Sequence, residues 1–303
     1  MASDAQSPWR RLSRRWMGLL DSLRRPWTTP GAPFKLAHLR TRPRWMNEAV
    51  IRSLCRSAYL GDGTAICRVL GRYKIYLDTA DVGHSGHLLL DGHWEMAVTE
   101  TLARLVKPGM VVADVGANLG YYTLTMGELV GESGWVHAFE PNPPIAERLR
   151  RSVSINTGYN RTTVHPLALS DHDGEAALYV PPAEPKNATL GAGAGDGWVT
   201  VPVRRLDSLP GLERLDLIKI DVEGAEEALW RGLDGLLRAG RALTILLEFA
   251  AARCADPDAF VDSILAAGFT ISLIRQDGGL DPLGKTALLA LPRTGDRMLL
   301  LQR

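Results

Sequence analysis

The stretch VVADVGANLG, residues 111–120, decides the fold of this chain. Its apolar start, its polar and glycine-rich middle and the TyrTyrThrLeuThr that follows predict a strand, a tight turn and a helix. Gly116 and Gly120 let the backbone approach a bound ligand, and the N-terminus of the following helix offers free N–H groups to the ligand's polar end. We therefore interpret residues 111–120 as a cofactor turn.

A carboxylate follows this turn at a characteristic distance. The apolar run from Trp135 to Phe139 predicts the next strand, and it ends in Glu140, about 20 residues after Gly120. If the two strands are parallel, Glu140 lies at the same sheet edge as the turn. A carboxylate there can accept hydrogen bonds from both hydroxyls of a ribose.

From Val111 onward, strand-like and helix-like segments alternate. This alternation predicts an α/β fold with a doubly wound, mostly parallel, Rossmann-like sheet covered by helices on both faces. Strands are expected at 111–115, 135–139, 162–167, 215–220, 243–249, 270–275 and 286–291, and helices at 144–156, 225–238 and 257–267.

The stretch from 175 to 206 breaks the alternation. It reads as a short strand at 176–180, a loop rich in Pro, Gly and Ala, and a second strand at 198–204. We interpret it as an insertion, placed where it can lie over the cofactor.

The region before residue 65 has a different composition. Residues 8–25 place Trp and Leu at helical spacing with arginines on the other side, which is typical of an amphipathic helix. Contact with an anionic membrane, docking on the domain or a partner, and a partly ordered tail all stay open for it. Prolines predict a linker over 26–44. Residues 1–64 are thus expected to form an N-terminal extension and 65–303 the main domain.

Three further elements are expected between residues 47 and 106. They are a helix near 47–59, a hairpin over 65–79 that turns at Gly71, and a helix over 94–106. Between the last two lie His84, His87 and His93, which we interpret as loop or hydrogen-bonding histidines because no cysteine or clear carboxylate partner accompanies them.

Charge and cysteine content restrict the class of protein. The formal net charge of +1 argues against a dedicated nucleic-acid binder. Cys55, Cys67 and Cys254 are odd in number and lack CxxC spacing, so neither a disulfide framework nor a zinc site is indicated. No apolar run reaches the roughly 18 residues that cross a bilayer. These features favour a cytoplasmic protein, with peripheral membrane contact through residues 8–25 left open.

The turn favours one cofactor over another. A dinucleotide turn has three glycines, whereas this one reads DxGxNxG, with Asn118 at the middle glycine position. Asp114 can position an ammonium group, and the backbone from Gly116 to Gly120 can approach a carboxylate and a sulfonium-bearing chain. This combination favours S-adenosylmethionine over NAD.

A second acidic group follows in LIKIDVEGAE, residues 217–226. An apolar strand brings Asp221 and Glu223 to its C-terminal edge, where open α/β sheets bind ligands. We expect Asp221 to accept a proton from a substrate hydroxyl, and Glu223 to orient the substrate or bind a cation. Alternatively, Glu223 caps the next helix and Lys219 is a strand-edge charge. Glu248 is either a third catalytic carboxylate or a structural one, and no spacing demands a divalent metal.

Four segments together resemble the FkbM family of S-adenosylmethionine-dependent methyltransferases. They are DVGANLGYYTL (114–124), AFEPNP (138–143), ALSDHDG (168–174) and IKIDVEGAE (218–226), and GHWE (92–95) is similar to the segment that precedes the family's glycine turn. The resemblance covers about residues 66–290.

The resemblance implies a class I methyltransferase sheet of seven strands and methyl transfer to a hydroxyl of a sugar, a glycolipid or another secondary metabolite. It also implies that Glu95 contacts the methionine end of the cofactor and that Ser170 or Asp171 lies near the adenine. Two other classes stay open: an NAD-dependent oxidoreductase, and a non-catalytic module that keeps the fold to bind a partner or membrane. A homo-oligomer is also left open.

Overall fold

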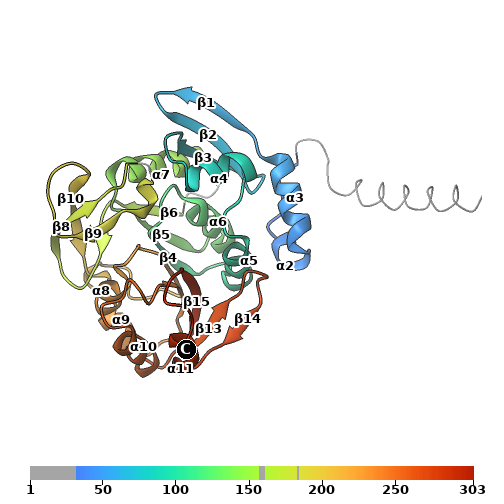
Figure 1. Ribbon diagram of the computed structural model, residues 1–303. Coiled ribbons are helices and arrows are strands. Elements are labelled where there is room, and N and C mark those ends of the chain that lie inside the picture. The colour runs from blue at the N-terminus through green and yellow to red at the C-terminus, as the bar shows by residue number, and fades with distance from the viewer. Residues whose placement is uncertain (1–31, 157–160, 183) are drawn as a thin grey trace, which may run out of the picture.

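The computed structural model describes residues 32–156, 161–182 and 184–303 (Figure 1). The amphipathic helix predicted at residues 8–25 lies outside the described residues. Within the described ranges, none of the helices combines the length and the apolar character that crossing a bilayer requires.

A mixed sheet forms the centre of the molecule. In the described part of the chain it has eight strands, in the order β14-β13-β15-β12-β11-β4-β5-β6. The strands are β4 (Val111–Val115), β5 (Trp135–Phe139), β6 (Thr162–His165), β11 (Leu217–Ile220), β12 (Thr244–Phe249), β13 (Thr270–Ile274), β14 (Leu280–Pro282) and β15 (Arg297–Gln302). The strands from β12 to β6 run parallel, and β15 is antiparallel to β12. The expected doubly wound, class I methyltransferase arrangement is therefore confirmed, with β14 as an additional eighth strand at the edge.

The chain order reverses between β4 and β11. From β4 the chain moves outward through β5 and β6, and it later returns to the other side of β4 as β11. In open α/β sheets, ligands bind outside the carboxyl ends of the strands at such a reversal. The end of β4 is therefore the expected site.

Helices cover both faces of the sheet, and a separate core fills each face. Along β4, Val112 packs into one core and Ala113 and Val115 into the other, because successive side chains of a strand point to opposite faces. The first core includes side chains of α5 (Met96–Leu105) and α6 (Tyr121–Val130), and the second those of α8 (Glu226–Arg231), α9 (Asp234–Arg238) and α10 (Pro257–Ala266). The helix α7 (Pro143–Ile155) packs beside β3 and β6.

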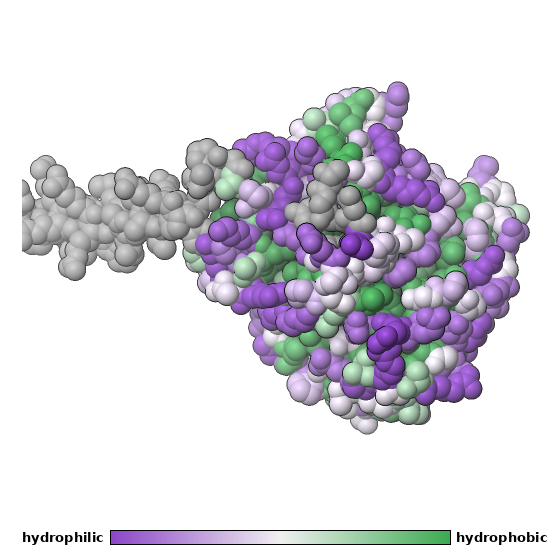
Figure 2. All heavy atoms as spheres, turned by 180° about the vertical axis from the view of Figure 1, so that it is seen from behind, coloured by the Kyte–Doolittle hydropathy of each residue, from purple (hydrophilic) through white to green (hydrophobic). Residues whose placement is uncertain are grey.

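The hairpin predicted over 65–79 is confirmed. β2 (Thr64–Val69) pairs with β3 (Tyr73–Asp78) around Gly71, which has a φ of +58°. A third strand, β1 (Ser57–Gly61), pairs with β2 and projects at the top of Figures 1 and 2. The helix expected near 47–59 is wrong at its end: α3 (Arg44–Leu54) stops before β1, because Cys55 already has extended backbone angles.

The described part of the predicted linker is packed against the domain. Phe34, Leu36 and Leu39 are buried in the same core as α5, and residues His38–Thr41 form the short helix α2. Pro43 occupies the N-cap position of α3. The proline-rich composition therefore predicted a linker where the described residues, from 32 onward, instead form packed turns and helices.

The predicted insertion forms its own small sheet. The strands expected at 176–180 and 198–204 are present as β8 (Gly174–Tyr179) and β10 (Trp198–Arg204). They join β7 (Ala168–Leu169) and β9 (Thr189–Gly191) in the order β7-β10-β8-β9. Two 3-10 turns, Pro185–Asn187 and Leu206–Ser208, complete this segment. We call the small sheet and its loop the cap.

Three other expectations differ from the structure. The strand predicted at 286–291 is the helix α11 (Lys285–Leu289), since a short run rich in Ala and Leu cannot be assigned by periodicity alone. The helix predicted over 225–238 is divided into α8 and α9 at Gly232, where a Cβ atom would lie 2.0 Å from the Ser170 carbonyl oxygen. The segment with His84 and His87 is the helix α4 (His84–Asp91), not a loop.

Gly116 provides a test of this packing. It has a φ of +76°, and a Cβ atom there would lie 1.8 Å from the Asp221 carbonyl oxygen. We predict that Gly116→Ala lowers the free energy of unfolding by at least about 3 kcal/mol in denaturant titrations, since strain and overlap add.

Gly86 provides the matched control. It lies within α4 and has open space around the position of a Cβ atom. Gly86→Ala should raise stability by about 0.5–1 kcal/mol, because alanine is the better helix former. Equal effects of the two substitutions would contradict the close contact at Gly116.

Candidate active site

The turn after β4 is held by contacts to two neighbouring strands. The Gly116 and Ala117 N–H groups donate to the Phe139 carbonyl oxygen at 3.1 and 2.9 Å. On the other side, Gly116 packs against the backbone of Asp221, which leaves no room for a side chain. Asn118 and Gly120 have φ angles of +48° and +97°. The predicted glycine turn is therefore confirmed as a left-handed turn that touches the acidic motif.

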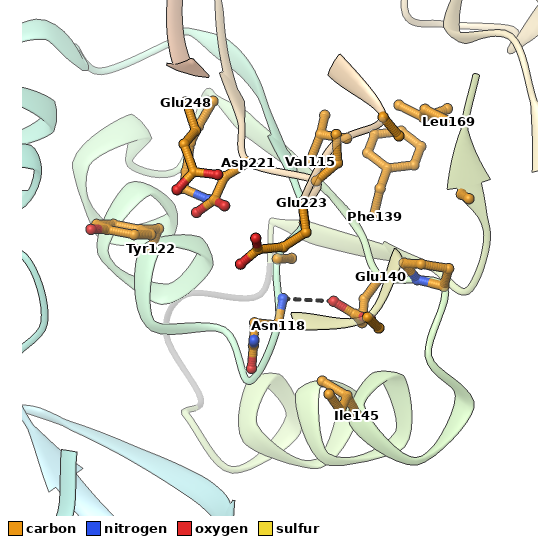
Figure 3. Close-up of a pocket in the computed structure, with 18 of the residues that line it drawn as sticks. Val115, Asn118, Tyr122, Phe139, Glu140, Ile145, Leu169, Asp221, Glu223 and Glu248 are labelled. Atoms are coloured by element: carbon orange, nitrogen blue, oxygen red, sulfur yellow. Dashed lines mark hydrogen bonds and ion pairs between the residues drawn. The ribbon is translucent and has the colours of Figure 1, made fainter. Parts of the chain in front are cut away.

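A cavity of about 290 Å³ opens beside this turn, at the carboxyl ends of the central strands (Figure 3). One end is mainly apolar and contains Glu140, and the other end gathers the carboxylates of Asp221, Glu223 and Glu248. The cap contributes a wall of mostly apolar residues, namely Leu178, Pro185, Ala188 and Leu190. The insertion therefore borders the cavity, as the sequence led us to expect.

Glu140 lies at the apolar end. Its Oε2 accepts from the Asn118 N–H and its Oε1 from the Asn142 N–H, both at 2.9 Å. Figure 3 shows Phe139, Ile145 and Leu169 around it, which gives this end the apolar surface that a nucleobase requires. Each carboxylate oxygen can still accept one more hydrogen bond. Burial raises the pKa of Glu140 to about 7.

Asp114 is not one of the residues that line the cavity. It is fully buried, its Oδ2 accepts from the Thr123 hydroxyl at 2.6 Å, and its Oδ1 lies 3.7 Å from the Lys219 ammonium. Lys219 is also buried, and it donates to Asp221 Oδ2 at 3.0 Å. Burial lowers the pKa of Lys219, but the charges of Asp221 and Asp114 raise it by more, so the lysine stays protonated.

Glu95 lies at the carboxylate end of the cavity. It has a φ of +33°, which is unusual for a residue with a side chain, and its Oε2 accepts from the Tyr122 hydroxyl at 2.8 Å. Burial and the Glu95 charge raise the pKa of Tyr122 well above its ordinary value, so this hydroxyl remains a donor. Trp94 lines the cavity next to Glu95, and its ring lies 4.7 Å from that of His84.

The three predicted catalytic carboxylates meet in space. Asp221, Glu223 and Glu248 place ligand atoms within 4.8 Å of one another, the one such group of metal-ligand type among the described residues. Arg253 lies among them, with Nη1 2.9 Å from Glu223 and Nη2 2.6 Å from Glu248. A cation would therefore have to compete with this guanidinium.

Electrostatics in this group favour a bound proton. Burial and the charges of Asp221 and Glu223 raise the pKa of Glu248 to about 9, although Arg253 opposes the shift. Arg253 is shared by three carboxylates, those of Glu223, Glu248 and Asp296, and one guanidinium cannot neutralise all three, which favours a proton on Glu248. Glu248 lines the cavity and is also paired with Arg253, so its position fits both interpretations made from the sequence, and a catalytic role for it stays a prediction.

The turn that carries Glu223 is capped by another residue. Glu226 is buried, and its carboxylate accepts from the Val222 and Gly224 N–H groups at 3.0–3.2 Å. α8 has no side-chain cap, so the helix-capping role considered for Glu223 is wrong, and Glu226 instead stabilises the turn before the helix. Glu223 itself has a φ of +52° and lines the cavity.

Ser170 and Asp171 do not line the cavity. Ser170 is buried, and Asp171 forms ion pairs with Arg231 and His172. The preceding residues of the same segment, Ala168 and Leu169, line the cavity instead. The segment therefore borders the cavity through residues one or two positions earlier, and a contact of Ser170 or Asp171 with the adenine stays a prediction.

Sequence reasoning missed two cations of the site. Lys219 offered a signal, because a lysine in the middle of an apolar central strand must find buried partners. Arg253 offered none, since its partners Glu223 and Asp296 come from distant segments.

Comparisons with known proteins agree with this geometry. The family profile described as "Methyltransferase FkbM domain" matches residues 114–271. Methyltransferase 1 of Beauveria bassiana is 31% identical in an alignment 146 residues long that covers 41% of this chain and 58% of that protein. The 2-O-methyltransferase NoeI of Sinorhizobium fredii is 32% identical in an alignment 152 residues long that covers 44% of this chain and 61% of that protein. The chain thus spans about three fifths of the length of these relatives.

A solved structure of Methyltransferase FkbM from Methylobacillus flagellatus KT is also similar. It aligns with a TM-score of 0.41 at 15% identity and covers 69% of this chain and 54% of that chain.

The strand order and the cavity define a class I methyltransferase domain. Because the family profile matches more than half of the chain, this protein belongs to the FkbM family of S-adenosylmethionine-dependent methyltransferases. Of the classes left open by the sequence, the family membership supports the methyltransferase enzyme and not the oxidoreductase.

We predict that Glu140 makes the affinity for the cofactor depend on pH. The carboxylate must be ionised to accept hydrogen bonds on both oxygens from a ribose as well as from the two N–H groups. With a pKa of about 7, its ionised fraction falls about tenfold between pH 8 and pH 6. We predict a similar fall in S-adenosylhomocysteine affinity, measured by calorimetry.

Two variants test the cause of this fall. Glu140→Gln should bind weakly with little pH dependence, whereas Glu147→Gln, a change at an exposed residue of α7, should behave as the wild type. Retention of the full pH dependence in Glu140→Gln would refute the ribose assignment.

Proposed function

We propose that this protein transfers a methyl group from S-adenosylmethionine to a hydroxyl oxygen of a small acceptor such as a sugar or glycolipid. The observation that carries the proposal is that one cavity joins a nucleoside-like end at Glu140 to a group of carboxylates at Asp221. The name of the relative 2-O-methyltransferase NoeI supports oxygen as the acceptor atom.

The lining residues fit the proposed cofactor along its length. Phe139 and Leu169 would enclose the adenine, Glu140 would accept the ribose hydroxyls, and the left-handed turn at Gly116 lets the backbone approach the chain beyond the ribose. Glu95, in hydrogen-bond contact with Tyr122, would hold the ammonium of the methionine end. When bound, the cofactor supplies an electrophilic methyl carbon on a sulfonium.

Asp221 is the residue best placed to accept the proton of the acceptor hydroxyl. Its Oδ2 accepts a hydrogen bond from Lys219, which fixes the carboxylate, and its Oδ1 remains for a second hydrogen bond. Glu223 and Glu248 are each paired with Arg253 and would orient neighbouring hydroxyls. Most of the catalysis would come from holding the acceptor oxygen in line with the methyl group.

The charge at this end of the cavity constrains the acceptor. Asp221, Glu223, Glu248 and Asp296 all line it, and they would repel an anionic group. A neutral compound with several hydroxyls can instead donate to these carboxylates. For a glycolipid acceptor, the Trp and Arg pattern of residues 8–25 would favour peripheral contact with an anionic membrane.

Asp221→Asn tests the proton-accepting role. The asparagine keeps the shape but cannot accept the proton, so we predict that kcat falls by about 10²–10⁴ while S-adenosylhomocysteine affinity changes little. The measurement is transfer of a labelled methyl group to a panel of neutral sugars and glycolipids.

The control is Asp258→Asn, a change at an exposed residue of α10 that should leave turnover unaltered. Since Arg253 already pairs with Glu223 and Glu248, we assign no step to a divalent cation, and EDTA should also leave turnover unaltered. Normal turnover of Asp221→Asn would remove this residue from the mechanism.

A further inference from the structure

Two of the three cysteines, which are 12 positions apart in the sequence, lie side by side in the structure. Cys55 follows the last residue of α3, and Cys67 lies in β2. Their sulfur atoms are 3.7 Å apart, in the region of Figure 1 where α3, α4 and β2 meet. The odd cysteine count concealed this pairing, because only the fold shows that Cys254 is the one left over.

Both thiols point at the C-terminal end of α4. The Cys67 sulfur lies 3.2 Å from the Leu88 carbonyl oxygen, and the Cys55 sulfur lies 3.5 Å from the Leu89 carbonyl oxygen. The Leu88 carbonyl also accepts from the Gly92 N–H, so it would keep a donor if the thiols were lost. The sulfur atoms therefore converge on one small volume, which limits the movement that a bond between them would need.

We propose that Cys55 and Cys67 form a reversible intramolecular disulfide on reaction with a small-molecule disulfide such as oxidised glutathione. The sulfurs need to approach by about 1.7 Å to reach the S–S bond length of about 2.0 Å. The bond would join the end of α3 to β2 beside Gly92, where a Cβ atom would already lie 2.9 Å from the Cys55 Cβ. Gly92 is three residues before Glu95 of the cavity, so the modification site adjoins the segment that carries a cofactor contact.

The two thiols differ in exposure and in pKa, so that one can attack the small-molecule disulfide first and the other can then complete the protein disulfide. Cys55 is partly exposed and Cys67 is buried. The hydrogen bond with Cys67 lowers the pKa of Cys55 to about 7, and burial together with the same hydrogen bond raises that of Cys67. Cys55 is therefore the accessible nucleophile.

The electrons balance in two exchange steps. The Cys55 thiolate attacks one sulfur of oxidised glutathione, forms a mixed disulfide and releases one glutathione thiolate, which takes up a proton. Cys67 then loses its proton and attacks the Cys55 sulfur, so that the protein disulfide forms and the second glutathione leaves. Two protein thiols are oxidised, and one glutathione disulfide is reduced to two thiols.

Mass spectrometry of the native full-length chain tests the proposal. After treatment with oxidised glutathione, we expect the loss of two hydrogens, a linked Cys55–Cys67 peptide, and reversal by dithiothreitol. The oxidised chain should also melt a few degrees higher, because the link restricts the unfolded chain. Three remaining thiols, or glutathione held on Cys55 while Cys67 stays reduced, would overturn the proposal.

Single-cysteine variants identify the partners. Cys254→Ser should form the disulfide as the wild type does, and Cys67→Ala should instead retain one glutathione on Cys55. The linked peptide is measured in the wild-type chain, so the proposal can be tested even if Cys67→Ala fails to fold. A disulfide that forms in the wild type but disappears in Cys254→Ser would contradict the assignment.

Discussion

The ammonium of Lys219, buried between two aspartates, is the interaction on which the site depends. Lys219 lies in the central strand β11, and its partners are Asp114 on the adjacent strand β4 and Asp221 at the end of β11. A buried charge is costly unless it is paired, so the position of each group is dictated by the other two. The cation therefore links the strand that begins the cofactor turn to the residue proposed to accept the proton.

Close packing and hydrogen bonds connect the Lys219 ion pairs to the other residues of the cavity. Gly116 contacts the Asp221 backbone, and in the turn that follows Gly116 the Asn118 N–H donates a hydrogen bond to Glu140. On the other side, Glu226 caps the turn that presents Glu223, and Arg253 pairs with Glu223 and Glu248. The nucleoside-like end and the carboxylate end are thus held at a fixed separation by the backbone, and not by mobile side chains alone.

The sequence predicted those parts of the site that lie within one continuous motif. The turn at 114–120, Glu140 at the end of the next strand, and Asp221 with Glu223 each follow from a strand that ends at a known sheet edge. Asp114 was placed in the right motif but with the wrong partner, because only the fold shows that its side chain points to Lys219 and Thr123. Arg253 and the cap residue Leu190 could not be predicted, since nothing in their local sequence shows what they contact.

The errors in the fold have a similar origin. The strand expected at 286–291 and the helix α11 found there have the same short, apolar composition, and only the pairing of β15 with β12 and β13 decides which segment completes the sheet. The described part of the proline-rich stretch was expected to be a linker, yet Phe34 and Leu39 are buried, because proline sets backbone angles and says nothing of the side chains around it.

The most direct measurement is a double-mutant cycle of Lys219 and Asp114 by denaturant unfolding. Lys219→Met leaves Asp114 buried without its cation and should lower the free energy of unfolding by about 3–5 kcal/mol. Adding Asp114→Asn should recover a large part of that loss, because the remaining pair of side chains is neutral. Losses that simply add would contradict the coupling, and a Lys219→Met variant as stable as the wild type would contradict the central role of the buried lysine.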